Sequence, residues 1–173
     1  SEKVSKKNVL VLTHTEIHTS DWKRMLELLH KLHQKEDINL SILPHIRGMI
    51  NMKPPKNLEN VWDKSSNLDS AVKKADIVIF WTTSAIFEAV VRNKKIFFLS
   101  FLSKLDGEYI WQKEAPTNIV IKNETELSDE INKYKKNDFV DNSCFEKIIW
   151  PSGDPWSNAS NFLDRFLNNK TNN

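Results

Sequence analysis

Three small hydroxyl residues, Thr82, Thr83 and Ser84, stand directly before an apolar segment with helical spacing. A hydroxyl-rich turn at the start of a helix offers backbone N–H groups, and the positive end of the helix dipole favours an anion, so the pattern suits a phosphate. Glu88 lies four residues after Ser84 and would project from the same face of the helix, where its carboxylate could accept from ribose hydroxyls. The alternative is that Thr83 or Ser84 only caps the helix and that Glu88 is a solvated residue.

Two further polar segments follow apolar runs. His45 and Arg47 stand two residues apart after the run 39–43, so in an extended chain both point to one side and could contact a diphosphate or a base. Unrelated polar residues of a surface loop are the alternative. His14 follows the first apolar run and is a candidate substrate contact. His14 and His18 lie four residues apart in a loop and not on a regular element, so we predict no metal site.

The glycine-rich phosphate motifs are missing. The sequence contains no GxGxxG, GxxxxGK[ST] or GxSxG, and its three glycines lie at positions 48, 107 and 153. A nicotinamide-dependent enzyme, a P-loop NTPase and a serine hydrolase therefore lack their signatures. A phosphate site in this chain would have to be built on hydroxyl residues.

The elements that must position these residues alternate along the chain. Apolar runs predict strands over residues 8–13, 39–43, 58–63, 76–81, 95–102 and 117–121. Helical spacing predicts helices from residue 20 or 21 to about 37 and over 68–75, 85–93 and 124–136, with another one carrying Phe162, Leu163 and Phe166. This alternation predicts a Rossmann-like, doubly wound parallel sheet with helices on both faces. Ligands bind such sheets beyond the carboxyl ends of the strands, where the three polar segments would lie. Trp81 should be mostly buried beneath the hydroxyl turn.

Composition limits the class of protein. We expect a single domain over residues 1–167 and a frayed end over 168–173. The net charge of +2 and the scattered lysines argue against nucleic acid as a partner. The longest apolar run, 77–81, is far shorter than the ~18 residues needed to cross a bilayer. One cysteine, Cys144, excludes an internal disulfide and favours the cytoplasm. Because the chain lacks an initiator methionine, we expect a domain excised from a longer protein.

Residues 73–102, KKADIVIFWTTSAIFEAVVRNKKIFFLSFL, resemble the donor-binding segment of GT-B glycosyltransferases. Residues 44–49, PHIRGM, lie where the CDP-glycerol glycerophosphotransferase, sialyltransferase-like and capsule Kdo-transferase groups carry a His-Pro after the second strand. Residues 151–167 resemble the end of bacterial surface-carbohydrate proteins. Ile46 in place of that proline, and Asn-Lys-Lys over 93–95 in place of Gly-Lys-Pro, depart from the pattern.

The resemblance implies one half of a GT-B fold, in an enzyme of capsule, lipopolysaccharide or teichoic-acid biosynthesis. Thr83 and Ser84 would hold the donor phosphate, Glu88 the ribose, and His45 the phosphate or the base edge. The donor would be a CMP- or CDP-activated sugar or polyol phosphate, with a UDP donor as the alternative and no required cofactor. A missing N-terminal domain would bind a glycan or lipid-linked acceptor and supply the catalytic base. Peripheral association of the full enzyme with the inner face of the membrane is a further expectation.

Two rival classes stay open. A flavodoxin-like or receiver-like module would need a flavin loop or paired aspartates, whereas residues 14–21 contain no glycine and no paired aspartates support a receiver-like pocket. The other rival is a structural domain of a larger assembly that has no ligand of its own.

Overall fold

The computed structural model describes residues 6–13, 19–35, 37–45, 54–63, 67–81, 83, 85–102, 119–136 and 138–142, with side chains of the first helix from residue 23 onward. The chain divides into two compact units, Ser1–Val140 and Asp141–Asn173. The fold described below is that of the first unit. The helix expected to carry Phe162, Leu163 and Phe166 lies outside the described residues.

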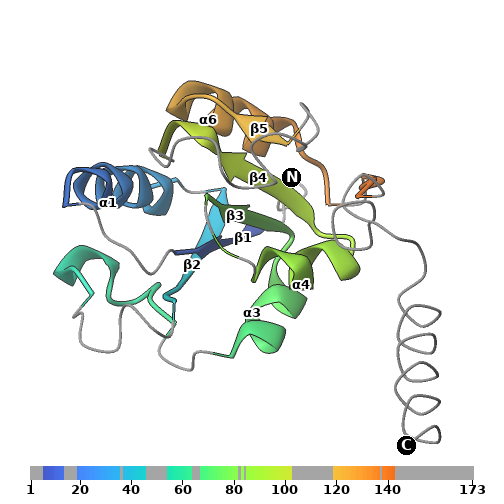
Figure 1. Cartoon of the computed structure of the whole chain (residues 1–173), viewed down its shortest axis with the longest axis horizontal. Helices are drawn as coiled ribbons and strands as arrows, with labels where there is room; N and C mark the ends of the chain where they lie inside the picture. The colour runs from blue at the N-terminus through green and yellow to red at the C-terminus, as the bar shows by residue number, and fades with distance from the viewer. Residues whose placement is uncertain are drawn as a thin grey trace, which may run out of the picture. The chain divides into compact units, whose positions relative to one another are not determined.

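Five parallel strands form one sheet with the order β2-β1-β3-β4-β5 (Figure 1). The strands are β1 (Lys7–Leu12), β2 (Ile38–Leu43), β3 (Ile77–Phe80), β4 (Lys95–Leu99) and β5 (Val120–Ile121). The helices are α1 (Thr19–His33), α3 (Leu68–Lys74), α4 (Ile86–Val91) and α6 (Glu124–Lys133), with 3₁₀ turns η1 (Lys56–Leu58) and η2 (Ser100–Leu102). The predicted α/β class and the parallel, doubly wound sheet are confirmed.

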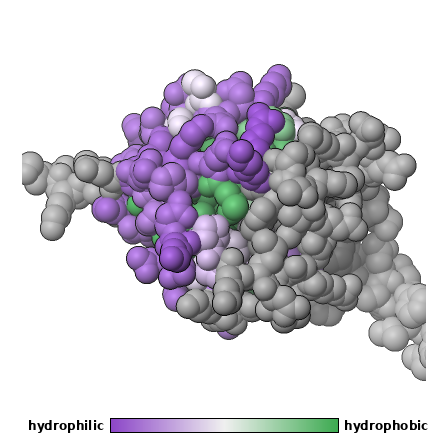
Figure 2. Space-filling view, turned by 90° about the vertical axis from the view of Figure 1, so that its left-hand side faces the viewer, coloured by the Kyte–Doolittle hydropathy of each residue, from purple (hydrophilic) through white to green (hydrophobic). Residues whose placement is uncertain are grey.

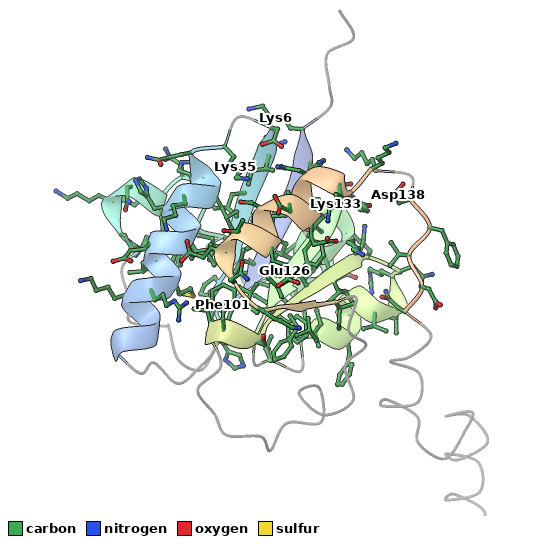
Figure 3. The ribbon with its side chains drawn as sticks, turned by 90° about the horizontal axis from the view of Figure 1, so that it is seen from above. Lys6, Lys35, Phe101, Glu126, Lys133 and Asp138 are labelled. Carbon is green, nitrogen blue, oxygen red and sulfur yellow. The ribbon has the colours of Figure 1, made fainter. Side chains whose placement is uncertain are left out.

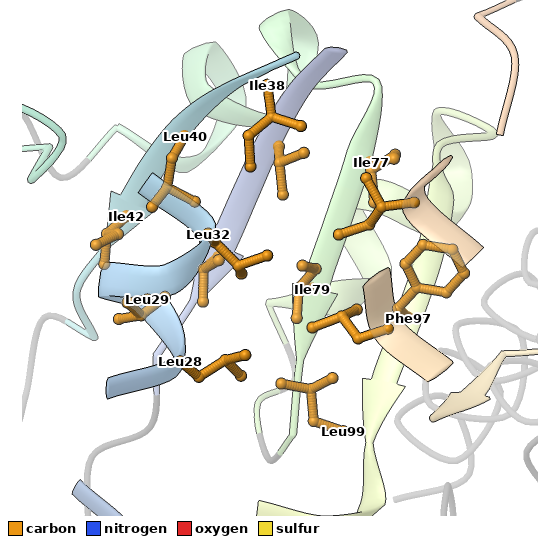
Figure 4. Packing of buried hydrophobic residues seen from close by; sticks show 14 of the residues in the cluster. Leu28, Leu29, Leu32, Ile38, Leu40, Ile42, Ile77, Ile79, Phe97 and Leu99 are labelled. Carbon is orange, nitrogen blue, oxygen red and sulfur yellow. The ribbon is translucent and has the colours of Figure 1, made fainter. Parts of the chain in front are cut away.

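Alternate residues of each strand point to opposite sides of the sheet, and both sets are apolar and buried in the central strands. Helices therefore cover both faces of this sheet. On one face α1 and α6 pack on a continuous apolar cluster (Figure 4), which includes Val9, Val11, Met25, Leu28, Leu29, Leu32, Ile77, Ile79, Phe97, Leu99, Leu127 and Ile131. On the other face α3 and α4 cover the intervening strand residues, among them Phe80 and Phe98, whose ring centroids are 5.4 Å apart. The described residues on the side of α1 and η1 present a mostly hydrophilic surface with a small apolar area (Figure 2).

The short strand expected over residues 58–63 is wrong in extent. Apart from the 3₁₀ turn η1, the segment contributes one parallel bridge, between Ile42 and Trp62. The Ile42 N–H donates to the Val61 carbonyl at 2.7 Å, and the Asp63 N–H donates to the Ile42 carbonyl at 2.8 Å. When this bridge is counted as an edge position beside β2, the order becomes 3-2-1-4-5-6, which is the classic Rossmann order.

Other predicted elements end earlier than expected, among them β4, α1 and α6. β4 stops at Leu99 because Ser100 begins η2, where its hydroxyl donates to the Ile121 carbonyl at 2.9 Å. α1 ends at His33 and not near residue 37. α6 ends at Lys133; it begins after Asn123, whose side chain accepts from the Glu126 N–H at 2.9 Å and so satisfies an unpaired helical donor. None of the described helices is long and apolar enough to cross a membrane.

Hydrogen bonds at the amino ends of the strands join β1 to α6 and to the start of β3. Lys7 Nζ donates to the carbonyls of Ile131 at 2.7 Å and Asn132 at 3.0 Å, which are among the last carbonyls of α6. A cation at this end of a helix is favoured by the helix dipole. In addition, the Asn8 N–H donates to the Asp76 carboxylate at 2.8 Å, so β1 is held beside the start of β3.

Candidate functional site

The sheet topology identifies one edge where a ligand can enter. β1 and β3 are neighbours, but the chain leaves β1 towards α1 on one face and leaves β3 towards α4 on the other. The connections therefore diverge at the carboxyl ends of these strands, and ligands of open α/β sheets bind at such a switch point. Thr13 follows β1 and Thr83 closely follows β3, so Thr83, the described residue of the hydroxyl turn, lies at this edge.

Thr13 fixes the end of β1 to the segment after β2. Its side chain is almost fully buried, with 1% of its surface exposed. The Thr13 N–H donates to the Leu43 carbonyl at 3.2 Å, and the Thr13 Oγ1 accepts from the His45 N–H at 3.1 Å. These two bonds hold half-buried His45 at the carboxyl edge. Thr13 was not expected to matter for the site; a polar residue directly after the apolar run 9–12 was the available signal.

Thr83 organises the turn that leads into α4. Its Oγ1 accepts from the Ala85 N–H at 3.2 Å, and its side chain is buried. This bond closes the turn before the helix and is not a helix cap, because the N-cap of α4 is Ala85 and receives no side-chain cap bond. The hydroxyl proton of Thr83 is the group that can be donated to a ligand. α4 has only six residues, so the dipole that was expected to favour a phosphate sums over few peptide units.

These residues surround one small pocket of about 100 Å³. Its apolar wall comes from the ends of β1 and β2 and from the start of α3. Its polar groups are Thr13, His45 and Thr83. The full lining is Leu12, Thr13, Leu43, Pro44, His45, Leu68, Thr83 and Ala85. An apolar pocket with a few convergent polar groups is the usual form of a small-molecule site. Its described part can hold one ring or one small polar group.

A larger groove of about 220 Å³ lies elsewhere, over β1 and β2 beside α3. Asn8, Asn39, Ser41, Asp63 and Lys74 give it a polar lining. Two of these side chains bond each other, since Asn39 Nδ2 donates to Asn8 Oδ1 at 3.1 Å. We prefer the smaller pocket as the candidate site because it alone of the two lies at the carboxyl edge, where the fold directs ligands.

Glu88 does not line the pocket; it belongs to a cluster of charges between α3 and α4. Arg92, one helical turn later, pairs with the Glu88 carboxylate and also with Asp69 of α3. Lys73 binds the same aspartate at 2.7 Å. The Lys73 hydrogen bond and the nearby Arg92 charge lower the pKa of Asp69 below its ordinary value of 3.8. Glu88 is therefore an ion-paired residue and not the solvated side chain of the alternative reading.

The structure brings together two of the predicted site residues, His45 and Thr83, at one pocket. His14, Arg47, Thr82 and Ser84 lie outside the described residues. Trp81 packs against the core with only a minor part of its surface exposed, which agrees with the expectation that it is mostly buried.

Metal ligands do not gather anywhere in the described part of the chain, where no group of three or more histidine, cysteine, aspartate or glutamate side chains could hold an ion. A scan against protein-family models and searches of curated proteins and of solved structures find no match to this chain.

Proposed function

We propose that this chain is the donor-binding half of a GT-B-type glycosyltransferase and that it binds the nucleotide of an activated donor at the carboxyl edge of β1, β2 and β3. The observation that carries the proposal is the convergence of Thr13, His45 and Thr83 on one apolar-walled pocket at the topological switch point. The resemblance of residues 73–102 to donor-binding segments supports the same location.

Each pocket residue has a role in this proposal. The apolar wall of Leu12, Leu43 and Pro44 takes a face of the base or ribose. Thr83 donates its hydroxyl proton to a phosphate oxygen, and the imidazole of His45 contacts the phosphate or the base edge. Glu88 lies outside the pocket lining and Arg92 contacts its Oε1, so a ribose that extends beyond the pocket would donate its hydroxyls to Oε2. The catalytic base is not assigned, because the acceptor would bind to a separate domain.

The donor class and the setting are parts of the same proposal. A CMP- or CDP-activated sugar or polyol phosphate is preferred, with a UDP donor as the alternative, and the product would be a surface polysaccharide. No divalent ion or other cofactor is required, because the side chains of His45 and Arg47 and the hydroxyl turn would neutralise the phosphate. We place the enzyme in the cytoplasm, peripherally at the inner face of the membrane, where it would use a glycan or lipid-linked acceptor.

A flavodoxin-like binding module is a second candidate, because the five ladder-paired strands alone have the flavodoxin order 2-1-3-4-5. In that class the flavin also lies at the switch point. The pocket and its polar groups would then hold a flavin phosphate or ring, and the protein would not be a transferase.

Titration calorimetry of the chain with CMP, CDP, UDP and FMN separates these functions. We expect CMP and CDP to bind, and His45→Ala to weaken binding at least about tenfold, since a hydrogen bond to a charged group contributes about 1.5–3 kcal/mol. Asn39→Ala, in the larger groove, is the matched control and should change affinity less than about twofold.

Three results would change the conclusion. If UDP bound at least about tenfold tighter than CMP and CDP, a difference of about 1.4 kcal/mol, the cytidine preference would be wrong and the transferase proposal would stand. If FMN alone bound, the second candidate would replace the first. If no nucleotide bound at millimolar concentration, or Asn39→Ala had the larger effect, the proposed site would be wrong.

A further inference from the structure

Arg24 of α1 is held against Phe101 of η2, just beyond the carboxyl end of β4. The Arg24 Nη1 donates to the Phe101 carbonyl at 3.3 Å, and the guanidinium carbon lies 5.1 Å from the centroid of the Phe101 ring. Figure 3 shows Phe101 close to α1. A carbonyl and an aromatic face together fix both the position and the direction of a guanidinium. These two contacts restrict the rotamers of Arg24, whereas an arginine without such contacts on a protein surface samples many.

The charge of Arg24 is not compensated within the described part of the chain. Arg92, the other arginine that the structure describes, pairs with Glu88 and Asp69, and Lys31 and Lys133 each pair with a glutamate. No described carboxylate lies within ion-pair distance of Arg24, whose side chain is exposed. A guanidinium has five N–H donors in a planar fork, and the Phe101 carbonyl occupies one of them. A fixed, uncompensated fork is suited to bind an oxyanion.

The position of Arg24 continues the candidate site along the same edge of the sheet. His45 follows β2, Thr13 follows β1, Thr83 follows β3 and Phe101 follows β4. Neighbouring strands lie about 4.8 Å apart, so Phe101 stands roughly one strand spacing beyond Thr83, and the row from β2 to β4 spans about 14 Å. An elongated ligand with its base at the pocket and one phosphate at Thr83 would bring its next group towards Arg24.

The aromatic surroundings of Arg24 favour an anion that is attached to a larger ligand. Trp81 follows β3 directly and Phe101 lies two residues beyond β4; both are half-buried and pack against the same apolar cluster. The exposed part of the Phe101 ring offers an apolar surface at the guanidinium, against which a ring can lie. An anion next to such a surface is bound in a lower dielectric than in open water, which strengthens its attraction to Arg24.

We propose that Arg24 binds an oxyanion of the donor beyond the phosphate held at Thr83. This inference rests on the proposed function and adds a specificity-determining residue to it. Two sources share the chemistry: the outer phosphate of a nucleoside diphosphate and the carboxylate of an acidic sugar on a nucleoside monophosphate. In both cases the guanidinium fork donates side-on to the oxyanion, and the Phe101 carbonyl and ring keep the fork in place.

The test compares Arg24→Gln with Lys23→Gln, a neighbouring exposed position on α1 that loses the same unit of charge. Affinities for CMP, CDP and CMP-sialate are measured by calorimetry at one ionic strength, and circular dichroism checks that both variants are folded. We expect Arg24→Gln to weaken CDP or CMP-sialate at least about tenfold and CMP less than about twofold, while Lys23→Gln changes none of them more than about twofold. An effect on CDP identifies the outer phosphate, and an effect on CMP-sialate alone identifies the carboxylate. Arg24→Lys keeps the charge and loses the fork, so it should fall between wild type and Arg24→Gln.

Two outcomes overturn the inference and are distinguishable. If wild type binds the probes but Arg24→Gln and Lys23→Gln behave alike with all three, Arg24 is not part of the site, and the proposed function stands. If wild type binds none of the three probes, the proposed function fails and this inference fails with it.

Discussion

Replacing Thr13 by valine tests whether the carboxyl edge is held as described. Valine has nearly the shape of threonine but lacks the oxygen that accepts from the His45 N–H at 3.1 Å. Because Thr13 is only 1% exposed, water cannot take the place of that oxygen from the Thr13 side. Thr13→Val should therefore leave the His45 backbone donor without this bond while the apolar packing around residue 13 stays filled.

The expected cost follows from two opposing terms. An N–H left without its acceptor costs about 1–3 kcal/mol when it is buried. The additional buried methyl group of valine stabilises the folded state by about 0.8 kcal/mol. The difference is about 0.2–2 kcal/mol, and because His45 is half-buried, solvent can relieve part of the loss, so the decrease in the free energy of unfolding should lie in the lower part of this range. For a chain of this length the decrease in Tm should not exceed about 8 °C.

Thr13→Ser is the matched control, because it keeps the hydroxyl and removes the methyl group. It should also lose about 1 kcal/mol, but through packing and not through the hydrogen bond. Amide hydrogen exchange measured by NMR separates the two causes. The exchange rate of the His45 N–H should be higher than in wild type for Thr13→Val and equal to wild type for Thr13→Ser. If Thr13→Val is as stable as wild type and the His45 amide exchanges at the wild-type rate, the hydrogen bond does not hold the edge and the reasoning is refuted.

The remaining predictions concern the core, the charge cluster and the ligand. Phe97→Ala, at a position with no exposed surface, should cost about 3–5 kcal/mol in urea unfolding, whereas Phe139→Ala, at a side chain 92% exposed, should change stability by less than about 0.5 kcal/mol; equal effects would contradict the core assignment. The pKa of Asp69 is lowered by Lys73 first and Arg92 next, so its contribution to stability is present above pH 3.8 and lost as the pH falls through its folded pKa. Asp69→Asn should therefore show a flatter loss of stability in acid than wild type, and an unchanged slope in urea titrations down to about pH 2.5 would count against the cluster. Nucleotide binding should survive EDTA; a loss that Mg²⁺ restores would show that the site needs a divalent ion.

The α/β architecture was predictable because every central strand is buried on both faces. Segments such as IVIF in β3 and KIFFL in β4 are therefore almost continuously apolar, and this pattern is typical of parallel strands. The ends of the elements were less predictable, since they depend on contacts between distant residues. Ser100 illustrates this: the apolar run continues beyond it, but its hydroxyl bonds the Ile121 carbonyl and the strand stops.

The same distinction between local and distant contacts applies to the candidate site. Thr83 and His45 were visible because polar residues follow strand ends, and the Glu88–Arg92 pair has the i,i+4 spacing of a helical ion pair. The Asp69 partner of Arg92 comes from another helix, 23 residues away, and Arg24 and Phe101 are 77 residues apart. Residue spacing along a single element carries no information about such pairs. The topology of the sheet had to be known before they could be found.

The bonds from Lys7 to the last turn of α6 also bear on how the chain is made. They join residues 124 and 125 positions apart, so β1 receives these partners only after Ile131 and Asn132 have been synthesised. At about 5–20 residues per second, these partners are synthesised roughly 6–25 s after β1. During this interval the apolar face that Leu127 and Ile131 later cover is exposed to solvent and to other nascent chains. Translation that stops before α6 should therefore yield an aggregation-prone product and not a smaller folded domain.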